Sequence, residues 1–552
     1  MTTPPPQEIE LKLALPPNEA DAFLKRMARR RTAPVEQALV TLYFDTPDFA
    51  LSAAGVALRV RRVGRRWLQT LKTEGERTGG LSRRIEYEMP VRSGALDWAR
   101  FPPEALACVP DRVRGQVVPV FETRFRRTAW LLKGQGGAQI EVALDVGEVV
   151  TLKGTRAGER CQPLCEIELE LKSGRPDALF ALALDWAGVF GCLPFDVSKA
   201  ERGVRLARGI EAAPDKALAL ALQRGMTVEA GFAAIVQACL AQFQANLPGV
   251  LEPLPQAGQR ANAGPQSMAS FPSPQPSPQM GEGANAEPKA INDIEYVHQA
   301  RVALRRLRAA LRQFRRVCAL PDELAAGLRA LAAALGPARD WDVLLTETLP
   351  AMAPHAPDAG AWQRGVAVLE ARRAEVRAEM RAALHAAPPG AWLRRMQRWV
   401  QAHGWRVEAD AGDQGARRLA QLDSLDDWAR QTLKRGHRRI VRDARAFSRL
   451  APAERHALRI AIKRQRYAAE FFRTLFGGKR AARYLAVLRA AQDSLGRGND
   501  AHVGAELLRT APPDTGSMGD FARGWLAARL ADTEGGDSAA VMRRLLDAPT
   551  YW

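Results

Sequence analysis

Charged side chains stand at every second position in several short segments of the first 205 residues. Glu8, Glu10 and Lys12 alternate with apolar residues, and similar alternation runs through VALRVRR, RRIEYEMPV, AQIEVALDV and CEIELELK. Because residues i and i+2 of a β-strand share a face, each segment predicts a strand with one charged face. For any single strand, a solvated sheet surface explains the pattern equally well. Several such strands closed into a barrel would instead line its interior with carboxylates and guanidinium groups.

An interior lined by both signs of charge suits a metal–polyphosphate complex. A triphosphate carries about four negative charges near neutral pH, so Arg and Lys must neutralise it. Mg²⁺ and Mn²⁺ prefer oxygen ligands and are often held by a few carboxylates together with phosphate and water. The same interior would suit a hydrophobic ligand poorly.

The second part of the chain has helical periodicity and an internal duplication. One charged pattern occurs twice with the same spacing, as His298, Arg301, Arg305, Arg306 and Arg308 and again as His456, Arg459, Lys463, Arg464 and Arg466. Downstream, LGPARDWDV is echoed by LGRGNDAHV. On a helix, the first, second, third and fifth members of each set form one stripe, in which like charges repel one another unless anions bind. Two such helices facing each other predict a basic groove.

The composition narrows the possible partners. The 552 residues include 80 Lys+Arg and 61 Asp+Glu, which gives a formal net charge of +19. This charge favours a polyanion such as nucleic acid, an anionic membrane or polyphosphate. No groove-reading motif or aromatic stacking platform is recognisable, so we expect nucleic acid to bind only non-specifically. The abundance of Arg in the helical part fits bidentate oxyanion recognition, and a GC-rich genome would explain it equally well.

The sequence also gives expectations about the compartment. The N-terminal segment MTTPPPQEIELKL lacks the basic region and apolar core of a signal peptide. No apolar stretch is long enough to span a bilayer, and six Cys do not suggest a disulfide framework. We therefore expect a cytoplasmic protein with no membrane partner.

The change in periodicity predicts two domains. We expect a strand-rich domain over residues 1–213 and an all-α domain over residues 214–552, so that the fold class is α+β. Residues 252–290 are rich in Pro, Gln, Ser, Ala and Gly and cannot build a core. They predict a disordered insertion between helices of the second domain.

Residues 6–205 carry an ordered set of motifs. EIELK at 8–12 is followed by YFDT at 43–46, LRVRR at 58–62, QTLK at 69–72, ALDVGE at 143–148, CEIELELKSG at 165–174 and DVSKAERG at 196–203. The first is an E-x-E-x-K signature, and the whole set resembles the CYTH domain, also called the triphosphate tunnel metalloenzyme. This resemblance implies an eight-stranded antiparallel tunnel that hydrolyses a triphosphate with Mg²⁺ or Mn²⁺.

The resemblance also implies roles for individual residues. Phosphate would be bound by Lys12, Arg59, Arg61, Lys72, Arg127 and Lys199, with Arg124 and Arg126 as alternatives to Arg127 and with Arg202 assisting Lys199. The metal would be bound mainly by Glu168 and Glu170, supported by Glu8, Glu10 and Asp145, with Glu166 as an alternative to one of them. Water would be the nucleophile, activated by the metal or by Glu8 or Glu10, and the residues leave this choice open.

The helical part resembles the CHAD domain over residues 224–510, through VHQARVALRRLR, LGPARDWDV, RHALRIAIKRQRY and LGRGNDAHV. The resemblance implies two related helical bundles and a basic cavity that binds polyphosphate. The implied contacts are His298, Arg301, Arg305, Arg306, Arg339, His456, Arg459, Lys463, Arg464 and Tyr467. Asp340 and Asp500 would orient Arg side chains or bind a metal. His298 and His456 are disfavoured as metal ligands because each is followed by Arg and lacks an acidic or His partner one turn away.

The combination of the two domains resembles the bacterial inorganic triphosphatases. It predicts hydrolysis of inorganic tripolyphosphate to pyrophosphate and phosphate, with long-chain polyphosphate bound by the helical domain, which could tether the protein to polyphosphate granules. One alternative is a polyphosphate-binding protein without catalysis. Another is a nucleotide-processing tunnel enzyme such as an adenylate cyclase, because many tunnel residues would be shared.

Overall fold

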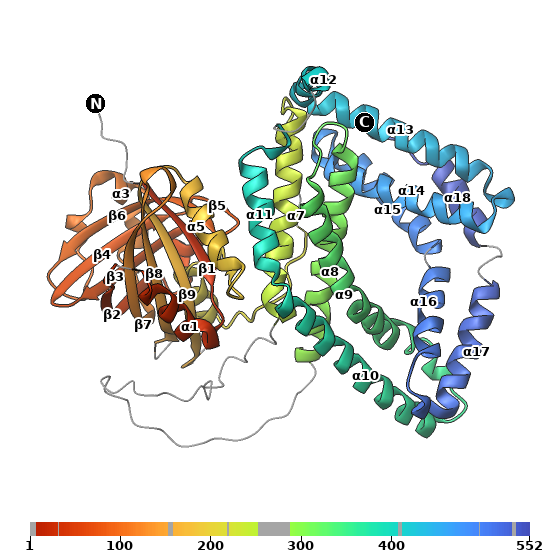
Figure 1. The fold of residues 1–552 in the computed structure, drawn as a ribbon, viewed down its shortest axis with the longest axis horizontal. Coiled ribbons are helices and arrows are strands. Elements are labelled where there is room, and N and C mark those ends of the chain that lie inside the picture. Colours follow the sequence, from red (N-terminus) through yellow and green to blue (C-terminus); the bar gives the residue numbers. More distant parts are fainter. Residues whose placement is uncertain are drawn as a thin grey trace. The chain divides into compact units, whose positions relative to one another are not determined.

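The computed structural model describes residues 7–30, 32–152, 158–217, 220–251, 288–406, 411–495, 497–532 and 537–552. The chain divides into two compact units (Figure 1). The first comprises the residues up to Ala213 and the segments Glu252–Asp293 and Pro388–Arg394, and the second comprises Pro214–Leu251, Ile294–Ala387 and Arg395–Trp552. Apart from residues 288–290, the predicted insertion at 252–290 lies outside the described residues.

The first unit is built around an antiparallel sheet closed into a barrel. Its strands are β1 (Gln7–Ala14), β2 (Val35–Asp45), β3 (Val56–Val63), β4 (Arg66–Thr73), β5 (Glu76–Thr78), β6 (Leu81–Val91), β7 (Val118–Lys133), β8 (Gln139–Thr151), β9 (Cys161–Ser173) and β10 (Leu193–Pro194). Eight of them follow the order β1-β9-β8-β7-β2-β3-β4-β6, and β6 pairs with β1 again. The predicted eight-stranded tunnel is therefore confirmed.

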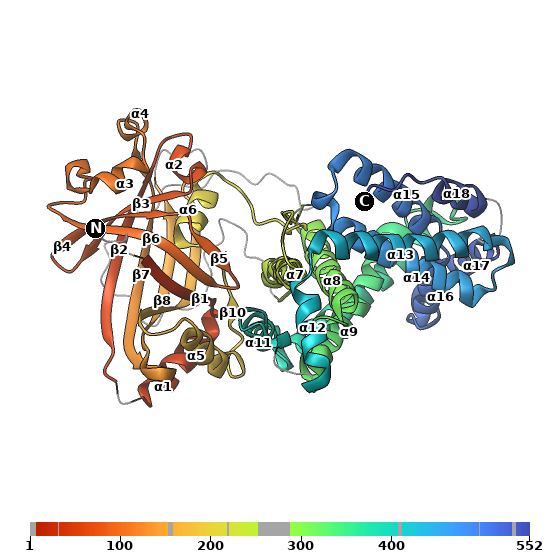
Figure 2. The same cartoon turned by 90° about the horizontal axis from the view of Figure 1, so that it is seen from above.

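The apolar faces of the strands determine which side chains face the interior. Leu11 on β1 and Leu169 on β9 pack outward against Phe23 and Leu179, which lie on α1 (Ala20–Ala28) and α5 (Asp177–Ala187). Both helices lie beside the barrel (Figure 2). Because successive strand residues point to opposite faces, the alternating charged residues of β1 and β9 point into the barrel. Short helices complete this unit: α2 (Ala50–Ala53), α3 (Pro103–Ala107) and α4 (Asp111–Arg114).

Helix α6 (Lys199–Ala207) closes part of the interior. Its Leu206 packs with Tyr43 and Phe125, which are inward-facing residues of β2 and β7. Gly203 lies against the ring of Phe121, where an added Cβ would come within 1.9 Å of a ring atom. Only glycine allows this approach, so α6 fills one portion of the barrel and leaves the charged portion open.

The second unit is entirely helical apart from an isolated bridge between Thr227 and Ser424, among the described residues. Its helices are α7 (Val228–Leu251), α8 (Pro288–Phe314), α9 (Asp322–Val343), α10 (Ala359–Ala386), α11 (Pro389–Gln401), α12 (Ala411–Leu422), α13 (Leu425–Arg445), α14 (Pro452–Phe471), α15 (Gly478–Ser494), α16 (Arg497–Arg509), α17 (Gly516–Asp532) and α18 (Asp537–Leu546). The first half of α11 is grouped with the first unit. The two copies of the charged pattern lie on helices α8 and α14. The predicted α+β class is confirmed. None of the described helices is long and apolar enough to cross a membrane.

Candidate functional site

The charged portion of the barrel contains a cavity of about 480 Å³. Ten residues proposed from the sequence line it, namely Glu8, Glu10, Lys12, Arg59, Arg61, Lys72, Arg127, Glu168, Glu170 and Lys199. All but Lys199 occupy inward-facing strand positions, and Lys199 begins α6. Ser198 caps this helix by accepting a hydrogen bond from the backbone N–H of Glu201, which fixes the position where Lys199 enters the cavity.

One network of charges joins β1, β4 and β6. Glu8 accepts hydrogen bonds from Lys72 Nζ at 2.7 Å and from Arg84 Nε at 2.8 Å. Arg84 Nη2 also donates to Glu10 at 2.6 Å. Burial opposes ionisation of Glu8, but the charges of Lys72 and Arg84 outweigh it and hold the pKa of this carboxyl below its usual range. Glu8 is therefore a firmly ionised group.

Sequence reasoning did not assign a role to Arg84, which lines the cavity between these two carboxylates. The alternation in RRIEYEM could have indicated this role, because it places Arg84 on the inward face of the strand. Tyr43 was also missed. It lines the cavity. Burial opposes ionisation of its phenol, but the charges of Arg59 and Arg61 outweigh this effect and lower its pKa.

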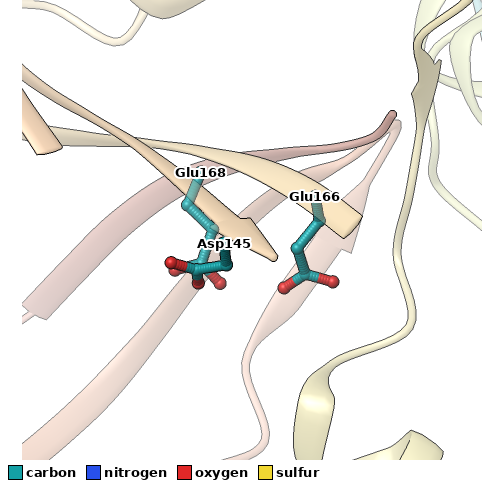
Figure 3. Close-up of side chains that lie close together, drawn as sticks. All are labelled: Asp145, Glu166 and Glu168. Carbon is teal, nitrogen blue, oxygen red and sulfur yellow. The ribbon is translucent and has the colours of Figure 1, made fainter. Parts of the chain in front are cut away.

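A second network surrounds the ammonium group of Lys199. Lys199 Nζ lies 2.6 Å from Asp145, 2.5 Å from Glu166 and 2.9 Å from Glu168. These three residues offer carboxylate oxygens that all lie within 4.8 Å of one another, as their convergence in Figure 3 illustrates. Burial disfavours a charged Lys199, yet the three carboxylates raise its pKa above the usual value. The ammonium therefore remains charged and neutralises the carboxylates.

Arg127 supports the same network from β7. It binds Asp145 through two hydrogen bonds of 2.8 Å and 2.7 Å and reaches Glu168 at 2.5 Å. Burial would raise the pKa of both carboxyls, but Arg127 and Lys199 together lower it. Asp145 itself is fully buried and does not line the cavity.

Arg61 is the cavity cation with the least compensation. Its Nε donates to Thr41 Oγ1 at 3.1 Å, and no carboxylate lies within 4.0 Å of its guanidinium among the described residues. Burial lowers the pKa of Arg61 to about 10, with repulsion from Arg59 and Arg127 as a further cause. An anion bound beside Arg61 would relieve this repulsion.

Glu170 and Glu10 lie on the facing strands β9 and β1. Glu170 lines the cavity, its side chain is 31% exposed, and its ion pair with Lys172 measures 2.7 Å. Burial raises its pKa. Glu10 stands opposite Glu170 in the strand register, and Glu168 lies two residues away on the same face. Carboxylate oxygens are the donors that Mg²⁺ and Mn²⁺ prefer. Among the described residues, the carboxylates that converge within 4.8 Å are those of Asp145, Glu166 and Glu168, and not those of Glu10 and Glu170.

The structure places three other predicted residues away from the cavity lining. Arg124 pairs with Glu122, and Arg126 is exposed, so Arg127 is the member of this trio that reaches the cavity. Arg202 donates to the carbonyl of Pro163 at 2.5 Å and lies 3.4 Å from Glu166. It therefore acts on the rear of the carboxylate cluster.

On the helical unit, basic residues from both copies of the pattern come together. The pKa of Lys463 on α14 is lowered to about 8. Burial is the largest cause, and repulsion from Arg305 on α8 and from Arg459 on α14 lowers it further. Arg301 also contributes, and it lies 3.9 Å from Asp340 on α9. Asp340 thus stands beside an Arg of the stripe, where the sequence placed it.

Arg339 and His298 extend this basic surface along α9 and α8. Burial lowers the pKa of His298, with the charge of Arg339 as the next cause. Arg339 also contacts Glu347 at 2.8 Å. We call His298, Arg301, Arg305, Arg339, Arg459 and Lys463 the basic stripe.

Four residues predicted to contact polyphosphate lie outside the basic stripe. Arg306 is buried and donates to Gln242 at 3.1 Å. Arg464 and Tyr467 line a different pocket, and His456 is exposed at the start of α14.

Two known families match separate parts of the chain. A family model described as the CYTH domain matches residues 6–204, and one described as the CHAD domain matches residues 282–509. Among curated proteins, the inorganic triphosphatase of Haemophilus influenzae is 34% identical over 213 residues. That match covers 36% of this chain and 55% of the relative, so the chain spans about half the length of the curated relative.

Two solved structures each match part of this chain. The CHAD domain of the plant Ricinus communis is 30% identical, with a TM-score of 0.45, and the match covers 62% of this chain and 99% of that one. The Hippeastrum protein HpAC1, described as having a dominant triphosphatase activity, is 20% identical with a TM-score of 0.26. It matches over 37% of this chain and 96% of its own.

Proposed function

Because this chain carries a CYTH domain followed by a CHAD domain, we propose that its tunnel hydrolyses inorganic tripolyphosphate to pyrophosphate and phosphate with Mg²⁺ or Mn²⁺. The inorganic triphosphatase activity of the Haemophilus influenzae relative supports the reaction class. The cavity supports the substrate class, because it combines cations for phosphate oxygens with carboxylates for a metal.

The uncompensated guanidinium of Arg61 is the observation that carries this proposal. Most cavity cations contact a carboxylate, whereas Arg61 lies near Arg59 and Arg127 without one among the described residues. A linear triphosphate would place phosphate oxygens among these three guanidinium groups. Charge that develops on those oxygens during hydrolysis would then be stabilised by groups already in position.

The remaining roles follow from position in the cavity. Lys12, Lys72 and Lys199 would contact phosphate from the walls, and Glu168 and Glu170 would hold the metal. Glu8 would be a poor general base, because its lowered pKa makes it a poor proton acceptor.

The basic stripe of the helical unit would bind long-chain polyphosphate. Burial lowers the pKa of Lys463 most, and repulsion from Arg305 and Arg459 lowers it further; a bound polyanion would relieve this repulsion. In the cytoplasm this binding would allow association with polyphosphate granules. Nucleic acid would bind only through its phosphates, and a non-catalytic polyphosphate-binding protein remains the competing function.

Phosphate release from tripolyphosphate by the full chain tests the proposal. Reactions with Mg²⁺, with Mn²⁺ and with EDTA are compared with parallel reactions on ATP and on long-chain polyphosphate. We expect EDTA-sensitive hydrolysis that favours tripolyphosphate over ATP. Tight polyphosphate binding without any hydrolysis would establish the non-catalytic alternative, and formation of cyclic AMP from ATP would establish the cyclase alternative.

A matched pair of variants tests the role of Arg61. Arg61→Gln removes the inward guanidinium, whereas Arg62→Gln removes its exposed neighbour on the opposite face of β3. Loss of a charged hydrogen bond predicts a decrease in kcat/KM of about 10- to 100-fold for Arg61→Gln. Equal activities of the two variants would contradict the phosphate site.

A further inference from the structure

The helical unit contains a second basic pocket, outside the basic stripe. It has a volume of about 430 Å³ and lies where the end of α8 meets α13 and α14. Its charged lining consists of Arg312, Arg315, Arg316, Arg435, Arg439 and Arg464. No Asp or Glu stands among its described lining residues. We call it the arginine pocket.

The positive charge of the arginine pocket is hardly compensated. In the described part of the chain, Arg312, Arg315 and Arg316 have no carboxylate within 4.0 Å, and Arg439 has only Asp443 at 3.9 Å. The pKa of Arg464 is lowered by burial and then by repulsion from neighbouring arginines of the pocket. An ordinary solvated helix face would mix acidic residues among the basic ones.

Tyr467 provides an independent observation. It lines the arginine pocket and is only 3% exposed, and its hydroxyl has no hydrogen-bond partner among the described residues. A buried hydroxyl without a partner costs free energy, because water no longer satisfies it. A phosphate oxygen in the pocket would accept this hydrogen bond.

The arginine pocket is distinct from the basic stripe although both involve α14. Lys463 is repelled by the charges of Arg305 and Arg301 of the stripe. The next residue, Arg464, is instead repelled by the charge of Arg312 in the arginine pocket. Consecutive residues on a helix point about 100° apart, so the repeated motif supplies cations to two separate surfaces.

We propose that the arginine pocket is a second binding site for condensed phosphate, additional to the basic stripe. The proposal rests on the polyphosphate-binding part of the proposed function. Guanidinium groups bind phosphate oxygens through paired hydrogen bonds, which suits the clustered arginines. A single-stranded nucleic acid is less suited, because the aromatic residues of the pocket, Tyr467 and Phe471, are buried and offer no face for stacking.

Titration calorimetry of the full chain in EDTA tests this site, with tripolyphosphate and long-chain polyphosphate as separate probes. The pocket variant is Arg315→Gln/Arg316→Gln, two exposed positions where folding is not at risk. The control variant is Arg480→Gln/Arg483→Gln, which removes the same charge from exposed positions on α15. We expect the pocket variant to bind one fewer tripolyphosphate per chain than the control variant.

Tyr467→Phe gives a second test that removes one oxygen atom. Because the hydroxyl has no partner in the described structure, this variant should retain its thermal stability. We expect its affinity for the pocket phosphate to decrease about tenfold.

Each further outcome has a definite meaning. Equal binding by the pocket and control variants would overturn the second site. If Arg301→Gln/Arg305→Gln alone reduced polyphosphate binding, the basic stripe would stand and the arginine pocket would not. If the wild-type chain bound neither probe at the helical unit, the polyphosphate function itself would fail. Pocket-dependent binding of single-stranded DNA in place of condensed phosphate would overturn the proposed ligand class.

Discussion

Replacing Lys199 with methionine should destabilise the tunnel unit more than any exposed charge change would. The ammonium group is the shared partner of Asp145, Glu166 and Glu168, at distances of 2.5 to 2.9 Å. The side chain of Lys199 is only 6% exposed, so water cannot replace it. Methionine preserves most of the volume, which isolates the loss of charge.

The expected magnitude follows from the charges that remain. Removing one member of a buried ion pair costs about 3–5 kcal/mol. Arg127 would still neutralise Asp145 and Glu168. Among the described residues, Glu166 would retain only Arg202 at 3.4 Å and Lys12 at 3.7 Å. We therefore expect the free energy of unfolding of the tunnel unit to decrease by about 3 kcal/mol, near the lower limit of this range. This is roughly a 100-fold change in the unfolding equilibrium.

Hydrogen exchange of peptides from β8 and β9 during denaturant titration measures this loss in the full chain, because it reports the tunnel unit separately. Lys172→Met is the matched control, since its ion pair with Glu170 is more exposed and should contribute at most about 1 kcal/mol. Adding Glu166→Gln to Lys199→Met should recover part of the stability, because it removes the least compensated carboxylate. Equal stabilities of Lys199→Met and Lys172→Met would refute the reasoning.

Three further predictions use other residues of the two units. Glu170→Gln should reduce metal-dependent hydrolysis with an unchanged melting temperature, whereas Glu168→Ala should reduce both, and activity assays beside thermal scans distinguish them. Because the folded-state pKa values of Asp145 and Glu168 are lowered, their stabilisation is present above the ordinary carboxyl pKa and is lost as pH falls through the lowered values. Unfolding free energies measured between pH 5 and pH 3 should therefore decrease for the tunnel unit, and a flat profile would contradict this. Polyphosphate binding should raise the pKa of Lys463 from about 8, so affinity should fall as pH rises above 8, and Lys463→Met should remove this dependence in calorimetric titrations.

The sequence predicted the tunnel wall well because strand periodicity fixes the face of every residue. Once Leu11 and Leu169 are assigned to the outer core, Lys12 and Glu168 must face inward. The partners of Lys199 could not be predicted in the same way. They depend on how α6 packs into the barrel, and this packing is decided by tertiary contacts such as that between Gly203 and the ring of Phe121.

The helical half shows a different limit. The resemblance grouped Arg305 with Arg306 and Lys463 with Arg464, because these pairs are adjacent in the repeated motif. Adjacent helical residues diverge in direction, and the structure directs Arg306 into the bundle and Arg464 into the arginine pocket. A motif defined along the chain therefore combined residues that serve different surfaces.

The paired charges of the tunnel predict that metal and triphosphate each strengthen binding of the other. Lys12, Lys72 and Arg127 all contact carboxylates of the tunnel wall. Triphosphate alone would draw these cations away and leave buried carboxylates unpaired, and a divalent metal alone would leave cations unpaired. Together they supply a partner for every side chain, so neither unpaired charge arises.

A non-hydrolysable imido analogue of triphosphate, titrated with and without Mg²⁺, measures this coupling. After correction for the complex that forms in solution, Mg²⁺ should increase the affinity about 5- to 150-fold, and the analogue should increase the affinity for Mg²⁺ by the same factor. Arg61→Gln is the informative control. Arg61 has no carboxylate partner within 4.0 Å in the described structure, so its loss should weaken the analogue equally with and without Mg²⁺. If the corrected affinities of the wild-type chain were equal, metal and phosphate would not exchange partners with the wall, and the paired charges would serve stability alone.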